Sequence, residues 1–273
     1  MSSGQPWGEI AIIDTMMNYP DPSDEAGQHD NPLFAKRGAI LAGGDPTGYM
    51  LAEMDRYKIS TAVINLGPEG GAVERAVHNH TKRFVATYAV DPNRGMDAVR
   101  ALEHAVKARG ARAAYVKPAL LTPQVPINDR LLYPVYAKCV ELDIPVFVLT
   151  GVPGPRVPSA PQKVELIDDV CWYFPDLKFV MRHGGEPWED MAVKLMVKWP
   201  NLYYSTSAFS PKYIPKAIVH YANTRGADKI MYAGYFPTLP LDRIFAELPQ
   251  VPFREHVWPK FLRENAARLL KLA

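Results

Sequence analysis

Four side chains that can exchange protons or bind anions stand at the ends of short apolar runs: Asp14, Lys117, His183 and Tyr235. His183 can act as a general acid or base, because the ordinary pKa of histidine is about 6.5. Tyr235 is a poor base but a useful hydrogen-bond donor to a developing oxyanion. Lys117 could bind an anion, and Asp14 could act as a base or hold the tautomer of His183. We predict that these four form a catalytic group, with a structural role as the alternative for each.

Further residues near the same run ends are candidates for substrate binding: Met16, Asn18, Tyr115, Leu149, Arg182 and Ser207. Side chains alternate along a strand, so an inward Asp14, His183 and Tyr235 would place all of these inward except Arg182. On an ideal strand Arg182 faces the helix layer, where we expect an ion pair. A bulge at the strand end would instead aim it at a carboxylate of the substrate.

The apolar runs that carry these residues are rich in β-branched side chains and span 10–14, 60–66, 83–90, 112–117, 144–150, 177–183, 202–208 and 229–235. Helix-length segments separate them, which predicts a parallel sheet covered by helices. Eight such units in 273 residues predict an α/β fold, a single-domain (β/α)8 TIM-like barrel over 1–273. Active sites of such barrels lie at the C-terminal ends of the strands, where the candidates fall.

The longest irregular stretch covers residues 19–46 and is rich in Pro, Gly and Asp. Loops of this length in compact domains usually have a function. We predict that this loop lies over the barrel mouth, where its His29 could reach the site.

The composition excludes several classes of partner. The net charge is +2 without a block of like charge, so no nucleic-acid partner and no basic membrane surface is expected. No apolar run approaches the roughly 20 residues of a membrane span, and the start of the chain shows no secretory signal. Cys139 and Cys171 fit buried thiols of a cytoplasmic protein, with a disulfide as the less favoured alternative. A small-molecule substrate is the expected partner.

Several segments, in this order and spacing, resemble the amidohydrolase superfamily: LAEMDRYKISTAVI at 51–64, HGGEPW at 183–188, WPNLYYSTSA at 199–208 and ENAARLLKL at 264–272. The chain is most similar to the amidohydrolase-related branch that includes aminocarboxymuconate semialdehyde decarboxylase and resorcylate decarboxylase. The resemblance covers nearly the whole chain. It implies the barrel, a site at the strand ends, a homodimer and a role in degrading aromatic or alicyclic compounds.

The chain departs from this family at the metal ligands. The family's Asp-x-His-x-His motif corresponds to residues 14–18, where Met16 and Asn18 replace both histidines. The strand-five histidine corresponds to Leu149 and the strand-eight aspartate to Tyr235, whereas His183 keeps the strand-six histidine. Zinc or manganese needs three or four converging ligands. We therefore predict no catalytic metal and no cofactor.

Three functions remain open. The first is a metal-independent acid/base lyase, of the decarboxylase or hydratase type, on a small carboxylated cyclic or unsaturated catabolic intermediate. The second is a metal-independent hydrolase, for example of a lactone, with His183 or Asp14 activating water. The third is a non-catalytic relative that binds a ligand. The retained Asp14, Lys117 and His183 favour an enzyme.

Overall fold

The computed structural model describes residues 6–21, 40 and 43–272, and a parallel sheet of eight strands, in chain order, forms its centre. The strands are Ile12–Asp14 (β1), Ile59–Asn65 (β2), Phe84–Ala89 (β3), Ala111–Val116 (β4), Val146–Leu149 (β5), Phe179–Arg182 (β6), Leu202–Ser205 (β7) and Ile230–Met231 (β8). Each overlaps one of the apolar runs, so the predicted strands are confirmed.

The segment after β8 returns to β1 and closes the barrel. The backbone N–H of Thr15 donates to the carbonyl of Tyr232 at 3.1 Å, and that of Tyr235 donates to the carbonyl of Met16 at 2.9 Å. The (β/α)8 prediction is therefore confirmed.

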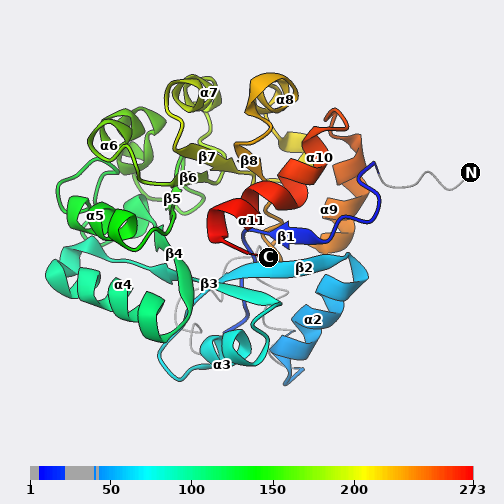
Figure 1. Ribbon diagram of the computed structural model, residues 1–273, viewed down its shortest axis with the longest axis horizontal. Helices are drawn as coiled ribbons and strands as arrows, with labels where there is room; N and C mark the ends of the chain where they lie inside the picture. The colour runs from blue at the N-terminus through cyan, green and yellow to red at the C-terminus, as the bar shows by residue number, and fades with distance from the viewer. Residues whose placement is uncertain (1–5, 22–39, 41–42, 273) are drawn as a thin grey trace, which may run out of the picture.

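Helices surround the sheet (Figure 1): Pro46–Arg56 (α2), Ala72–Asn79 (α3), Met96–Ala108 (α4), Tyr133–Glu141 (α5), Ile167–Tyr173 (α6), Glu189–Lys198 (α7), Lys216–Tyr221 (α8), Leu241–Glu247 (α9), Val257–Pro259 (α10) and Asn265–Leu270 (α11). They form where apolar residues recur at helical spacing, as in α4, which buries Val99 and Leu102 against the sheet. In the described part of the chain no helix is long and apolar enough to cross a membrane.

The inside of the barrel is filled by one apolar cluster: Ile13, Val63, Val85, Ala113, Tyr115, Phe147, Leu149, Val180 and Met231. Leu269 and Leu270 of α11 join this cluster, and Arg112, at the start of β4, donates to the carbonyl of Lys271. The end of the chain therefore covers the N-terminal ends of the strands, and in Figure 1 it lies over the centre of the barrel. The opposite end, where the strands finish, is left for the site.

Most of the loop predicted over the mouth lies outside the described residues. Of the stretch 19–46, the structure describes 19–21, 40 and 43–46, and His29 is not among them. Its placement over the mouth stays a prediction.

Candidate functional site

His183, Ser207 and Tyr235 come together from the ends of β6, β7 and β8. The Nδ1 atom of His183 lies 2.8 Å from Oγ of Ser207, and the backbone N–H of His183 donates to the same oxygen at 3.1 Å. The ring of Tyr235 lies edge-on to the imidazole, with the ring centres 5.1 Å apart. Ser207 thus fixes the imidazole through Nδ1 and leaves Nε2 as the nitrogen that can exchange a proton.

The backbone at these strand ends is left-handed at residues that are not glycine. The φ angles are 69° at His183, 76° at Ala208 and 61° at Tyr235. A side chain in this region costs about 1–3 kcal/mol and persists where the surroundings enforce it, often at functional sites. The left-handed turn also ends the alternation of β6, so His183 reaches Ser207 although its neighbour Arg182 faces inward.

Burial keeps His183 and Tyr235 neutral. Burial, and then the charge of Arg182, lowers the pKa of His183 from 6.5 to about 3. Burial raises the pKa of Tyr235 to about 12. At pH 7 the imidazole of the free protein is therefore uncharged and a weak base, and the phenol remains a hydrogen-bond donor.

Arg182 lies inside the barrel, so the expectation of an ion pair in the helix layer is wrong. Its guanidinium carbon is 4.6 Å from the centre of the Tyr115 ring and 4.5 Å from that of Phe147, and Nη2 donates to the carbonyl of Thr15 at 2.9 Å. The reason is register. Val180 belongs to the interior cluster, and alternation then turns Arg182 to the same side without a bulge.

Lys117 follows β4 at the rim of the mouth. Its Nζ lies 5.9 Å from the centre of the Tyr115 ring, and among the described residues no carboxylate pairs with it. Tyr115 therefore has Arg182 and Lys117 as cationic neighbours, which places positive charge beside the predicted substrate-binding residues.

Asp14 is fully buried where β8 meets β1, away from the face of the strand that Ile13 presents to the interior. Its Oδ1 accepts from the backbone N–H groups of Met16 and Gly234 at 3.0 and 2.9 Å, whereas its Oδ2 has no partner among the described residues. The prediction that Asp14 shares the inward face with His183 is wrong, because alternation starts from Ile13. Burial raises the pKa of Asp14 from 3.8 to about 7.

Asp14→Asn should make the fold more stable at alkaline pH. Because the pKa of Asp14 is higher in the folded protein than in the unfolded chain, its ionisation lowers stability progressively between about pH 4 and pH 7. Asparagine keeps the Oδ1 acceptor and has no charge. From pH 5 to pH 8 the variant should gain about 2–3 kcal/mol in unfolding free energy relative to wild type, measured by urea denaturation. Asp176→Asn, on the surface, is the control, and an equal gain there contradicts the account.

Gly234→Ala should destabilise the seam of the barrel, the junction between β1 and the segment after β8 where Asp14 is buried. A Cβ at this position would stand 2.6 Å from Oδ2 of Asp14 and 2.7 Å from the hydroxyl of Tyr232. Both atoms are buried, so overpacking of about 1–3 kcal/mol is expected in thermal or urea unfolding. Gly154→Ala is the matched control, because its Cβ would meet nothing within 4 Å. Equal stability of the two variants would contradict this prediction, because it would show that the neighbouring side chains move aside at little cost.

The other predicted binding residues lie apart from the hydrogen-bonded group at His183. Met16 contributes backbone contacts to the seam, and Leu149 lies in the interior cluster beside Arg182 of β6. Asn18 donates from Nδ2 to Oγ1 of Thr238 at 3.4 Å. None of these contacts the group of His183, Ser207 and Tyr235 through a hydrogen bond.

Two residues of the site escaped the sequence analysis. Thr15 offers its carbonyl to Arg182, and its hydroxyl donates to the carbonyl of Tyr232 at 2.8 Å and contacts Oγ of Ser205 at 3.1 Å. The hydroxyl of Tyr232 is buried without a partner among the described residues. Alternation from Ile13 would have indicated Thr15, whereas nothing in the sequence singles out Tyr232.

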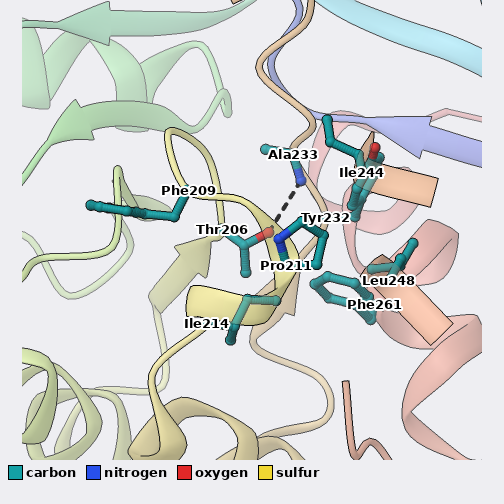
Figure 2. A pocket seen from close by; sticks show the side chains of 9 residues that line it. All are labelled: Thr206, Phe209, Pro211, Ile214, Tyr232, Ala233, Ile244, Leu248 and Phe261. Atoms are coloured by element: carbon teal, nitrogen blue, oxygen red, sulfur yellow. Dashed lines mark hydrogen bonds between the residues drawn. The ribbon is translucent and has the colours of Figure 1, made fainter. Parts of the chain in front are cut away.

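A small cavity lies outside the barrel, behind the ends of β7 and β8 (Figure 2). Its volume is about 10 Å³, and it is lined by Thr206, Phe209, Pro211, Ile214, Tyr232, Ala233, Ile244, Leu248 and Phe261. Oγ1 of Thr206 accepts from the backbone N–H of Ala233 at 3.3 Å, so its polar atom is already engaged. A space of this size holds at most one water molecule, and we assign it no substrate.

The side chains at the strand ends are not the set of ligands that zinc or manganese prefers. Among residues 6–21, 40 and 43–272, no three His, Cys, Asp or Glu side chains converge as ligands. The positions that the resemblance assigns to the family's metal ligands hold Met16, Asn18, Leu149, His183 and Tyr235. A thioether, a hydrocarbon, an amide and a protonated phenol beside one imidazole do not fit zinc or manganese.

The closed parallel barrel defines a TIM-barrel protein. Its polar groups lie at the C-terminal ends of the strands, where the active sites of TIM-barrel enzymes are found. Residues 13–272 match the Amidohydrolase family, and the chain belongs to this family. The resemblance inferred from the sequence is therefore confirmed. A search of curated proteins found no match.

Solved structures share the fold over nearly the whole chain. A TIM-barrel protein of Bordetella bronchiseptica, Bb4693, has a TM-score of 0.79 at 23% identity and covers 96% of this chain and 99% of its own. A 5-carboxyvanillate decarboxylase of Novosphingobium aromaticivorans, with manganese and 4-hydroxy-3-methoxy-5-nitrobenzoic acid, has 0.74 at 15%, covering 100% of both. A probable 2-pyrone-4,6-dicarboxylic acid hydrolase of Acinetobacter baumannii, with citric acid bound, has 0.70 at 13%, covering 96% and 100%.

Proposed function

We propose that this chain is a metal-independent lyase, of the decarboxylase or hydratase type, acting on a small carboxylated cyclic or unsaturated compound. The observation that carries the proposal is the group of His183, Ser207 and Tyr235 at three adjacent strand ends, two of them in left-handed backbone. A relic histidine would need neither the fixed imidazole nor the strained turns around it.

The two neutral groups divide the proton chemistry between them. For a ring that carries a hydroxyl beside its carboxylate, the bound carboxylate offsets the charge of Arg182, which otherwise weakens the imidazole as a base. Nε2 of His183 then takes the hydroxyl proton and delivers it to the carbon that bears the carboxylate. The C–C bond then breaks, its electron pair returns to the ring, and CO2 leaves. Tyr235 donates a hydrogen bond to the ring oxygen on which negative charge remains.

No step of this scheme uses a metal, because the donor set described above does not fit one. The manganese of the Novosphingobium decarboxylase belongs to that protein. In this chain, burial keeps Tyr235 protonated and Asp14 sits in the seam, so neither offers a ready anionic ligand.

The positive charges of Arg182 and Lys117 beside Tyr115 support the proposal that the substrate carries a carboxylate. Arg182 is buried beside Tyr115, and Lys117 stands at the rim on the same strand end as Tyr115. Lys117 is available to stabilise a carboxylate or the charge that develops as CO2 leaves.

A hydrolase is the second candidate, supported by the fold shared with the probable 2-pyrone-4,6-dicarboxylic acid hydrolase of Acinetobacter baumannii, and in it Nε2 of His183 would orient the attacking water. The two are separated by offering hydroxylated benzoic acids and carboxylated lactones to the purified protein. A coupled assay measures CO2, and NMR identifies the product. Release of CO2, or addition or loss of water at a double bond, supports the lyase. Ring-opened acid as the sole product overturns it in favour of the hydrolase, and binding without turnover leaves a non-catalytic relative.

A further inference from the structure

Arg182 is a buried cation without an ion pair among the described residues, and the carboxyl group that acts on its charge is that of the buried Asp14. The residue is 2% exposed, and among the described residues no carboxylate forms an ion pair with it. The carbonyl of Thr15 accepts a hydrogen bond from Nη2 and the side chain of Tyr115 is a second polar neighbour, whereas the N–H of Nε has no partner among the described residues. A buried charge is costly unless it is paired and hydrogen-bonded, so this guanidinium needs an anion.

The surroundings hold the guanidinium in one place. Its carbon atom Cζ lies 4.6 Å from the centre of the Tyr115 ring and 4.5 Å from the centre of the Phe147 ring. Thr15, which accepts its hydrogen bond, is itself fixed by donation from its hydroxyl to the carbonyl of Tyr232. A group that is immobilised before binding loses little entropy when a ligand arrives.

The neighbours at the same level of the barrel set the chemistry of the ligand. Leu149 and Ser205 pair with Arg182 across the flanking strands β5 and β7, so one side is apolar and the other carries a hydroxyl. A planar guanidinium matches the two oxygens of a carboxylate, and the apolar Leu149 beside it suits a ring that carries this group.

We propose that Arg182 is the binding residue for a carboxylate attached to a flat apolar ring, deep in the barrel mouth and below the rim cation Lys117. This deepens the proposed function, on which it rests for taking the mouth as the substrate site. It assigns the anchoring of the substrate to the buried guanidinium rather than to the ammonium group of Lys117.

Benzoate and its neutral isostere benzamide test the site without any turnover. Calorimetric titration should show that the wild-type protein binds benzoate about 10- to 100-fold more tightly than benzamide, because a hydrogen bond to a charged partner has this effect. Arg182→Met should abolish the preference, and Arg182→Lys should retain part of it. Arg100→Met, an exposed arginine of α4, should keep the full preference.

Three outcomes overturn the assignment: equal binding of benzoate and benzamide by wild type, an unchanged preference in Arg182→Met, or loss of the preference in Lys117→Met alone. If Arg182→Met does not fold, thermal shifts of wild type and Arg182→Lys with each probe decide the question, because a bound ligand raises the unfolding midpoint. Loss of benzoate binding in Arg182→Met together with full turnover by His183→Ala would support this site and refute the proposed function.

Discussion

Replacing His183 with alanine should lower kcat on any turned-over substrate by about 10²- to 10⁴-fold, the usual contribution of a positioned general acid or base. The imidazole is the group that moves the proton in the proposed scheme, and Ser207 holds it by a contact of 2.8 Å to Nδ1. Steady-state kinetics should place the loss in kcat rather than in KM, because the substrate carboxylate is held elsewhere.

His104→Ala is the control for this experiment, because that histidine lies on the surface and pairs with Glu69. The control should keep wild-type kinetics. If His183→Ala retains more than about a tenth of the activity, His183 is not the group that moves the proton. Ser207→Ala, which frees the imidazole without removing it, should give a smaller loss in kcat.

Replacing Tyr235 with phenylalanine should lower kcat by about 10²- to 10³-fold, as expected when one donor to a developing oxyanion is removed. Phenylalanine keeps the ring that packs edge-on against His183, so the loss reports the hydroxyl alone. Because burial holds the pKa of Tyr235 near 12, the hydroxyl stays protonated and the effect should be constant from pH 6 to pH 9.

Tyr213→Phe, at an exposed tyrosine, is the control and should leave kcat unchanged. A Tyr235→Phe variant with unchanged kcat and a raised KM would assign the hydroxyl to substrate binding instead. Equal kinetics of both variants would remove Tyr235 from the chemistry.

The barrel could be predicted from the sequence because its strands are short runs of β-branched and aromatic residues between amphipathic helices. The run 144–150 and the strand Val146–Leu149 illustrate this: buried on both faces, the strand is apolar throughout. Such a pattern gives the strand and its end, and so the right neighbourhood for the site.

The direction of each side chain at the strand ends could not be predicted in the same way. An all-apolar strand does not reveal which face is inward, so alternation counted from the wrong residue predicts the wrong side for Asp14 and Arg182. Left-handed backbone, as at His183 and Tyr235, is uncommon for residues other than glycine, so the sequence does not announce it. Partners such as Thr15 and Tyr232 come from strands more than 200 positions apart and carry no local signal.

The central claim is that the site works without a metal, and metal content tests it most directly. The protein is purified without a metal-binding tag, and transition metals per chain are measured by plasma mass spectrometry beside activity before and after a chelator. We expect well under about 0.1 equivalents, because one imidazole does not hold zinc or manganese, and activity that the chelator leaves unchanged. Near one equivalent of zinc or manganese, with activity lost to the chelator and restored by the metal, would contradict the account.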